Sequence, residues 1–226
     1  KLSVLSHMFT KAADWNMIDR TAIPKVKKLK ENNARLRYLS KEECQSLINA
    51  CEPHLKPIVI TALNTGMRKG EILSLKWDNV DLRHGFILLE RTKNGERREI
   101  PINDTLRNVL QSLTRRLDIP YVFYDPVTGK PYGDIKRSFA TACRKAGIRD
   151  FHFHDLRHTF ASQLVMAGVD ITTVSRLLGH KSLTMTLRYS HLAPAHLTEA
   201  VKKYDGFLNS KTGQNQGQKI SKLSRF

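Results

Sequence analysis

Several features are scarce or missing in this 226-residue sequence, and each absence excludes a class of protein. Cysteine occurs three times, at Cys44, Cys51 and Cys143, without a C-x-x-C pair, so a disulfide framework is not expected. No apolar run approaches the roughly 20 residues that a membrane-spanning helix needs. No secretory signal pattern is found either. Together these absences favour a protein of the reducing cytoplasm.

Acidic residues are also scarce relative to basic ones. The chain has 38 Lys and Arg against 21 Asp and Glu, which gives a formal net charge of +17. An excess of this size indicates a polyanionic partner, and nucleic acid is the commonest one. An anionic membrane surface is the alternative, but no basic amphipathic helix stands out. We therefore expect a DNA partner, no membrane, and a cytoplasmic location with the DNA.

The first part of the chain predicts one helix followed by a basic connector. Apolar residues recur at helical spacing over 3–18, and the stretch PKVKKLKENNARLR at 24–37 has too few apolar residues to pack. The chain opens in mid-pattern without an initiator Met, as expected for a fragment of a longer protein.

A compact domain is predicted next. Ser40 and Glu43 form a capping box at the start of its first helix. Another helix is expected at about 55–64, followed by a turn at Gly66 and a short helix. The tail from 209 is polar and basic, and we expect it to be flexible.

The segment 78–102 changes character from helical to extended. Two strand-like runs flank Asn94-Gly95, which is a strong signal for a tight hairpin turn, and DNVDL just before them is a candidate third strand. Helical patterns return afterwards. Four of them are expected at about 104–117, 134–146, 155–167 and 170–178, then one from 182 to about 191, and a last one after Pro194. The fold class is therefore α+β, mainly α, with a small antiparallel sheet near 78–102.

Several side chains of this domain suit chemistry on a phosphodiester. Arg68 lies where a turn enters a helix, and His154 precedes Arg157 by three residues at a helix N-terminus, which itself favours an anion. Arginine is always charged and can hold two phosphate oxygens with its planar fork. Histidine can donate a hydrogen bond and move a proton near neutral pH. Each of these residues taken alone is weak evidence, since a basic protein has many exposed cations.

The order of four separated motifs is more specific. NTGMRKGEILSLKWDNVD, TKNGERREIPI, HDLRHTFASQL and LLGHKSLTMTLRYSH follow one another along the chain. In wording and order they resemble the tyrosine recombinase (phage-type integrase) family, over about residues 36–205. The resemblance implies a site-specific recombinase or integrase that cleaves and rejoins DNA through a 3′-phosphotyrosyl intermediate, without metal, ATP or another cofactor.

The resemblance also implies a role for each matching residue. Arg68 and Arg157 would hold the scissile phosphate, and Lys93 at the hairpin would protonate the leaving 5′ oxygen. His154 would assist as general acid or base. His180 occupies a position that holds His or Trp in the family, and Tyr189 would be the nucleophile. Glu71 matches a structural position that braces the pocket.

The resemblance further implies domains and partners. Residues 1–35 would be the end of a core-binding domain plus a linker, 36–208 the catalytic domain, and 209–226 the tail. Double-stranded DNA would be the substrate, bound by a homo-tetramer, with a monomer for the isolated fragment.

Three alternatives remain for the same residues. His152, His154, His158 and Cys143 could form a zinc site, although their spacing fits no common structural pattern. Residues 171–190 have the outline of a helix-turn-helix, which would make the chain a DNA-binding module without catalysis. A type IB topoisomerase uses similar Arg, Lys, His and Tyr chemistry on a related fold. The helix-turn-helix reading leaves Arg68 and Lys93 without a reason, and the short chain favours a recombinase over a topoisomerase. His158 is expected to be a neighbour of the pocket with a packing role.

Overall fold

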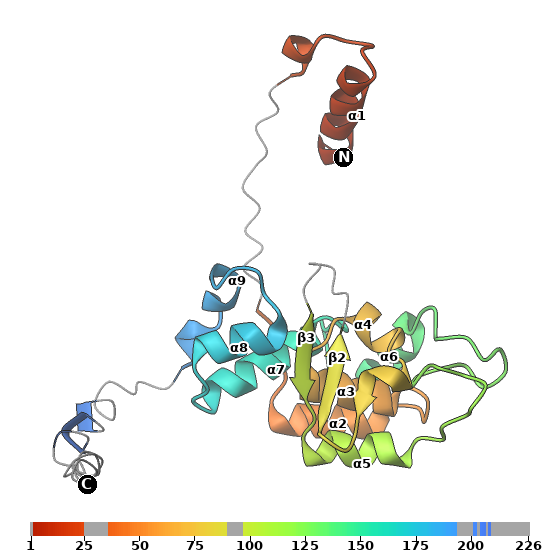
Figure 1. The fold of residues 1–226 in the computed structure, drawn as a ribbon, viewed down its shortest axis with the longest axis vertical. Helices are drawn as coiled ribbons and strands as arrows, with labels where there is room; N and C mark the ends of the chain where they lie inside the picture. The colour runs from red at the N-terminus through yellow and green to blue at the C-terminus, as the bar shows by residue number, and fades with distance from the viewer. Residues whose placement is uncertain are drawn as a thin grey trace, which may run out of the picture. The chain divides into compact units, whose positions relative to one another are not determined.

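The computed structural model describes residues 2–24, 36–89, 97–193, 201–202, 204–206 and 208. The chain divides into two compact units, Lys1–Arg35 and Leu36–Phe226 (Figure 1). Several predictions fall outside the described residues: most of the basic linker, the Asn94-Gly95 turn with Lys93, and the tail from 209.

The first unit contains the predicted N-terminal helix. Helix α1 spans Leu2–Asp14 and η1 spans Arg20–Ala22. Helix α1 ends earlier than the pattern predicts because Asn16 adopts a left-handed backbone conformation, with φ of 57°. The Asp19 carboxylate then accepts a hydrogen bond from the backbone N–H of Thr21 and caps η1.

The second unit is mainly helical, as the sequence predicts. Its helices are α2 Lys41–Ala50, α3 Lys56–Thr65, α4 Lys69–Leu73, η2 Trp77–Asn79, α5 Asp104–Ser112, α6 Lys136–Lys145, α7 Asp155–Met166, α8 Ile171–Leu178, α9 Thr184–Leu187 and η3 Ser190–Leu192. The predicted capping box is present, since Ser40 Oγ accepts from the N–H of Glu43 and the Glu43 carboxylate accepts from the N–H of Ser40. In the described part of the chain, no helix is long and apolar enough to cross a membrane.

The predicted antiparallel sheet is confirmed. Strands β1 Val80–Asp81, β2 Phe86–Leu89 and β3 Arg98–Pro101 pair in the order β1-β2-β3, with Ile87 opposite Ile100. Along β3, Arg98 and Ile100 are buried while Glu99 and Pro101 are exposed. This alternation is the ordinary pleat of a strand with one face on the core, and it turns Arg98 inward.

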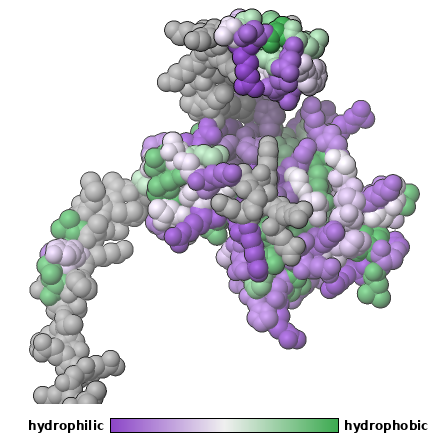
Figure 2. Space-filling view, turned by 45° about the horizontal axis from the view of Figure 1, so that its top comes forward, coloured by the Kyte–Doolittle hydropathy of each residue, from purple (hydrophilic) through white to green (hydrophobic). Residues whose placement is uncertain are grey.

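Two apolar clusters stabilise the second unit. The larger one joins α2, α3, α5 and the sheet through residues such as Leu47, Ile58, Ile87 and Leu106. The smaller one lies between α7, α8 and the turn that follows α9, and consists of Ala161, Val165, Val174, Leu178 and Tyr189. Figure 1 shows α7 between the sheet with its helices and the group formed by α8 and α9. Hydrophilic residues dominate the face of this unit seen in Figure 2.

Two helix predictions are wrong in extent. The helix expected from 182 to 191 forms only over Thr184–Leu187, and the chain then tightens into η3. Tyr189 is 1% exposed, and burying its ring in the smaller cluster requires this break. The helix expected at 104–117 ends at Ser112, because Leu113 turns to an extended conformation and packs against the larger cluster.

Candidate active site

Arg68 lies at the entrance to α4, where the predicted turn forms. Gly66 ends α3 in the left-handed conformation, with φ of 61°, and the chain reverses into α4 two residues later. Glu71 reaches back from α4 to hold Arg68. Its Oε2 accepts from the Arg68 backbone N–H at 2.9 Å, and its Oε1 accepts from Arg68 Nη1 at 2.8 Å. The Arg68 side chain stays 24% exposed, so it remains accessible to an anion.

The expectation that Glu71 braces the pocket agrees with these contacts. Burial opposes ionisation of its carboxyl group, but hydrogen bonds from Arg68 and the charge of Arg98 outweigh burial and lower the pKa of Glu71. The carboxylate is therefore ionised at neutral pH and holds cations in place.

Arg157 lies on the first turn of α7 and is 4% exposed. Its Nη1 donates to the carbonyl of Gly66 and its Nη2 to the carbonyl of Leu178, each at 2.6 Å. Burial, followed by the charges of Arg68 and Arg98, lowers the pKa of Arg157 to about 10. It is still a cation at neutral pH. Since these two bonds use two of the five N–H donors of the guanidinium group, donors remain for a phosphate.

Two predicted histidines share this cationic environment. His180 follows the left-handed Gly179 at the end of α8, and its Nδ1 shares a hydrogen bond with Thr186 Oγ1 at 2.8 Å. Burial, then the charges of Arg157 and Arg68, lowers its pKa to about 4. His154, at the N-terminus of α7, has its pKa lowered by burial and then by Arg157. Both rings are therefore neutral near pH 7, and both are within the electrostatic reach of the two arginines.

Tyr189 lies beside α7, and its hydroxyl shares a hydrogen bond with His158 Nδ1 at 2.5 Å. His158 in turn packs edge-on against His154, with ring centroids 5.2 Å apart. Burial raises the pKa of Tyr189, while the charges of Arg188 and Arg157 act in the opposite direction. His158 therefore does more than pack, because it is the direct partner of the Tyr189 hydroxyl.

The structure thus brings five of the six predicted residues into one cluster: Arg68, His154, Arg157, His180 and Tyr189. Lys93 lies outside the described residues. The cluster also contains Arg98, which the sequence patterns did not single out. The period-two spacing of Arg98, Ile100 and Ile102 was the available signal, since it predicts that Arg98 shares the buried face.

An open cavity of about 830 Å³ adjoins Arg68. Its walls come from α4, η2 and the end of β2, and include Glu71, Lys76, Asn79 and Leu89. The cluster therefore opens to solvent on the Arg68 side, where an extended anion can approach.

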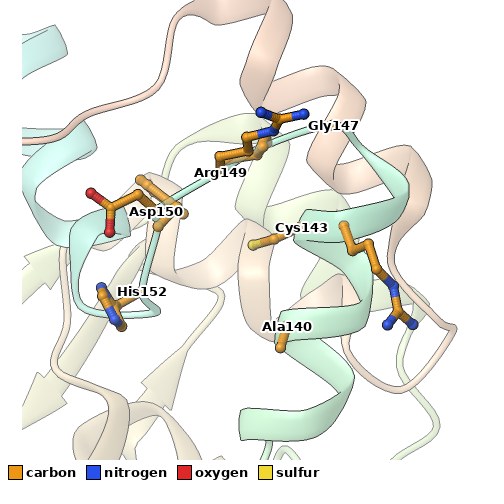
Figure 3. A pocket seen from close by; sticks show the side chains of 9 residues that line it. Ala140, Cys143, Gly147, Arg149, Asp150 and His152 are labelled. Atoms are coloured by element: carbon orange, nitrogen blue, oxygen red, sulfur yellow. The ribbon is translucent and has the colours of Figure 1, made fainter.

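The zinc alternative does not agree with the geometry. The described part of the chain contains no group of three His, Cys, Asp or Glu side chains placed to hold a metal ion. Cys143 and His152 line a separate pocket of about 520 Å³, formed by α6 and the segment 147–152 and shown in Figure 3. Burial raises the pKa of the Cys143 thiol to about 11.

Comparison with known proteins identifies the fold and the family. The model of the phage integrase family matches residues 37–196. The chain belongs to this family. An integrase of Salmonella phage P22 is 36% identical over 210 residues, which cover 87% of this chain and 54% of that protein. A shufflon-specific DNA recombinase of Escherichia coli is 34% identical, over 85% of this chain and 50% of that protein. The chain thus spans about half the length of these relatives.

Solved structures of the family share the fold. The catalytic domain of bacteriophage HP1 integrase aligns with a TM-score of 0.63 and 32% identity, covering 77% of this chain and 98% of that one. A lambda integrase dimer bound to a COC′ core site aligns with a TM-score of 0.65 and 26% identity, covering 83% of this chain and 57% of that one. The mainly α class with a small sheet is therefore the fold of an integrase catalytic domain.

Proposed function

We propose that this chain is the part of a site-specific DNA recombinase that cleaves and rejoins strands through Tyr189. The observation that carries the proposal is one cluster in which Arg157 interacts electrostatically with both Arg68 and Tyr189. In the transition state of phosphodiester cleavage, negative charge spreads over the phosphate oxygens. Two arginines provide fixed positive charge that stabilises this state. The similarity to integrases and a shufflon recombinase supports the same reaction class.

In this proposal the two arginines bind the non-bridging oxygens of one phosphate. Arg157 is fixed by its carbonyl partners, and Arg68 by Glu71, so little reorganisation is needed when charge develops. Tyr189 Oη then attacks phosphorus, a 3′-phosphotyrosyl bond forms, and the bond to the 5′ oxygen breaks. Lys93 supplies a proton to that leaving oxygen. Attack by a free 5′-hydroxyl reverses the step, so the energy of the phosphodiester is conserved and ATP is not needed.

The histidines complete the set. His154 lies at the N-terminus of α7 and assists in moving protons to and from the reacting oxygens. His180 is held through Nδ1 by Thr186, which leaves Nε2 for a hydrogen bond to the phosphate. Tyrosine normally ionises near pH 10, and burial raises the pKa of Tyr189 further. Deprotonation therefore depends on the nearby guanidinium groups and on transfer of the proton during the attack.

The partner in this proposal is double-stranded DNA. The net charge of +17 supports it, as does the cavity beside Arg68. The lambda integrase dimer bound to its core site is a precedent within the fold. We extend the proposal to assembly of four copies on DNA and to a cytoplasmic location with the DNA.

The proposal is tested by trapping the covalent intermediate. A nicked duplex carrying the recombination site releases a short 5′ fragment after cleavage, so rejoining is prevented and the adduct accumulates. We expect the adduct with the native chain and with the conservative control Tyr204→Phe, whose tyrosine is exposed and lies outside the cluster. An adduct that forms as well with Tyr189→Phe contradicts the proposal.

A further inference from the structure

Arg98 connects the two arginines that the proposed function places on the phosphate. We propose that Arg98 is a positioning residue, which sets the spacing of Arg68 and Arg157 without binding DNA itself. This inference rests on the proposed function, because it assigns a task to a side chain within the same site. Its support comes from two hydrogen bonds, one on each side of the pocket.

On the first side, Arg98 shares a carboxylate with Arg68. Arg98 Nη2 donates to Glu71 Oε2 at 3.0 Å, while Glu71 Oε1 accepts from Arg68 Nη1 at 2.8 Å. Both arginines are thus held by one ionised group that is itself largely buried. Charge-assisted hydrogen bonds to a carboxylate are among the stronger and more directional contacts in proteins. Removing Arg98 therefore takes away one of the two donors to Glu71 Oε2, which keeps the Arg68 backbone N–H, and the position of the Arg68 side chain becomes less defined.

On the other side, Arg98 shares a carbonyl with Arg157. Arg98 Nη1 and Arg157 Nη2 both donate to the carbonyl oxygen of Leu178, the latter at 2.6 Å. Leu178 is the last residue of α8, where carbonyl groups lack helical partners and carry partial negative charge. The same oxygen therefore fixes two guanidinium groups next to one another despite their like charge.

The residue after this carbonyl leaves space for Arg98. Gly179 has φ of 63°, a conformation that favours glycine. A Cβ atom at this position would overlap the Arg98 guanidinium group and lie 3.0 Å from its Cδ. The end of α8 thus accommodates the Arg98 side chain, and His180 follows directly in the chain.

A purely structural role explains these contacts less well. Arg98 is 8% exposed, and burial lowers its pKa, so the fold bears a desolvation cost for this charge. In addition, its Nε is buried without a hydrogen-bond partner in the described residues. An apolar side chain of similar length would avoid both costs.

The first test uses inorganic phosphate as the probe and does not depend on cleavage. The chain is titrated with phosphate while the ¹⁵Nε signals of Arg68 and Arg157 are followed by NMR. We expect Arg98→Met to shift both signals in the free protein and to weaken phosphate binding about tenfold or more, as for the loss of one charge-assisted hydrogen bond. Arg98→Lys should bind phosphate almost as weakly as Arg98→Met. An ammonium group lacks the planar fork with which the guanidinium group reaches both acceptors.

The matched control is Arg97→Met, one residue earlier on the exposed face, where the side chain pairs only loosely with Glu99 at 3.7 Å. It should leave the signals and the phosphate affinity unchanged. Unchanged signals and affinity in Arg98→Met would overturn the inference, and so would equal effects of the two variants.

The second test measures cleavage and separates positioning from general instability. At a temperature where Arg98→Met is folded, its rate of adduct formation on a nicked duplex should fall about 10²-fold, with duplex binding within a few-fold of the native chain. A duplex with a neutral methylphosphonate at the scissile position carries less negative charge for the arginines to stabilise. On this substrate, Arg98→Met should therefore lower the rate of adduct formation by a smaller factor than on the normal phosphate. A defect of equal size on both substrates would mean that Arg98 only supports the fold.

The two tests also separate this inference from the proposed function. If the native chain forms no adduct through Tyr189, the proposed function fails. The phosphate titration still decides whether Arg98 sets the spacing of Arg68 and Arg157.

Discussion

The hydroxyl oxygen of Tyr189 and Nδ1 of His158 lie 2.5 Å apart in the interior of the second unit. This contact joins the turn after α9 to α7, and it holds the proposed nucleophile in a buried position. Burial, followed by the charges of His154 and Arg188, lowers the pKa of His158 to about 4. The neutral imidazole is therefore the stable partner of the hydroxyl at neutral pH, and the hydroxyl must exchange this partner for phosphorus during the attack.

The energy of this contact can be measured by a double-mutant cycle. His158→Phe leaves the buried hydroxyl unpaired and should lower the free energy of unfolding by about 1–3 kcal/mol. In a Tyr189→Phe background the same change should cost about 1 kcal/mol less, since no hydroxyl remains to be stranded. Urea unfolding of the four proteins gives the coupling energy, and a coupling of zero would contradict the contact.

Arg68 and Arg157 should differ in their effect on stability while sharing an effect on cleavage. Arg157→Ala strands the carbonyl of Gly66 and removes one of the two donors to the carbonyl of Leu178, and it should lower the free energy of unfolding by about 2 kcal/mol or more. Arg68→Ala removes a partly exposed side chain and should lower it by less than about 1 kcal/mol.

Both variants should lose cleavage by about 10²-fold or more. DNA binding should largely remain, because many other cations contribute to backbone contact. Thermal unfolding, gel-shift titration and adduct formation measure the three quantities. Loss of binding in parallel with cleavage would count against a role in the reaction.

Acid should destabilise the second unit before its carboxylates are protonated. Folding lowers the pKa of His158 and of His180 from the ordinary 6.5 to about 4, and also lowers that of His154. Below about pH 6.5 the unfolded chain therefore binds more protons than the folded one, so stability falls as the pH drops from about 6.5 to about 4.

The variant His158→Gln keeps a hydrogen-bonding group near Tyr189 but does not titrate. Melting temperatures measured across this pH range should therefore fall less steeply than for the native chain. The exposed His191→Gln is the control and should keep the native slope. Parallel slopes for all three proteins would show that His158 is not buried as a neutral group.

Chelators should leave cleavage intact. The arginines supply the charge stabilisation that a metal ion gives in many phosphoryl-transfer enzymes. Adduct formation is measured with and without EDTA after exhaustive dialysis, and the two rates should agree. A rate that disappears with EDTA and returns with added zinc would restore the histidine-cluster alternative.

Much of the site could be predicted because the relevant residues lie at helix and turn boundaries that the sequence marks. Gly66 and Gly179 mark the ends of α3 and α8, and each is followed by a residue of the site, Arg68 or His180. The spacing of His154 and Arg157 places both on the first turn of α7. These boundaries can be predicted from the sequence because helix caps and left-handed glycines depend mainly on residues nearby in the chain.

The parts that could not be predicted depend on contacts between distant segments. The bond between His158 and Tyr189 spans 31 positions, and that between Arg98 and Leu178 spans 80. The break at Tyr189 has the same origin, since an apolar helical pattern over 182–191 does not reveal that one ring must turn into the core. Helical spacing predicts which residues can share a face of a helix. Tertiary packing decides where that helix ends.

The most direct test of the account is to locate the covalent bond itself. The native chain is incubated with the nicked duplex, the DNA is digested with nuclease, and the peptides are analysed by mass spectrometry. The account predicts a nucleotide attached through a 3′-phosphate to Tyr189, and no adduct in Tyr189→Phe. A nucleotide attached to any other residue, or an undiminished adduct in Tyr189→Phe, would contradict it.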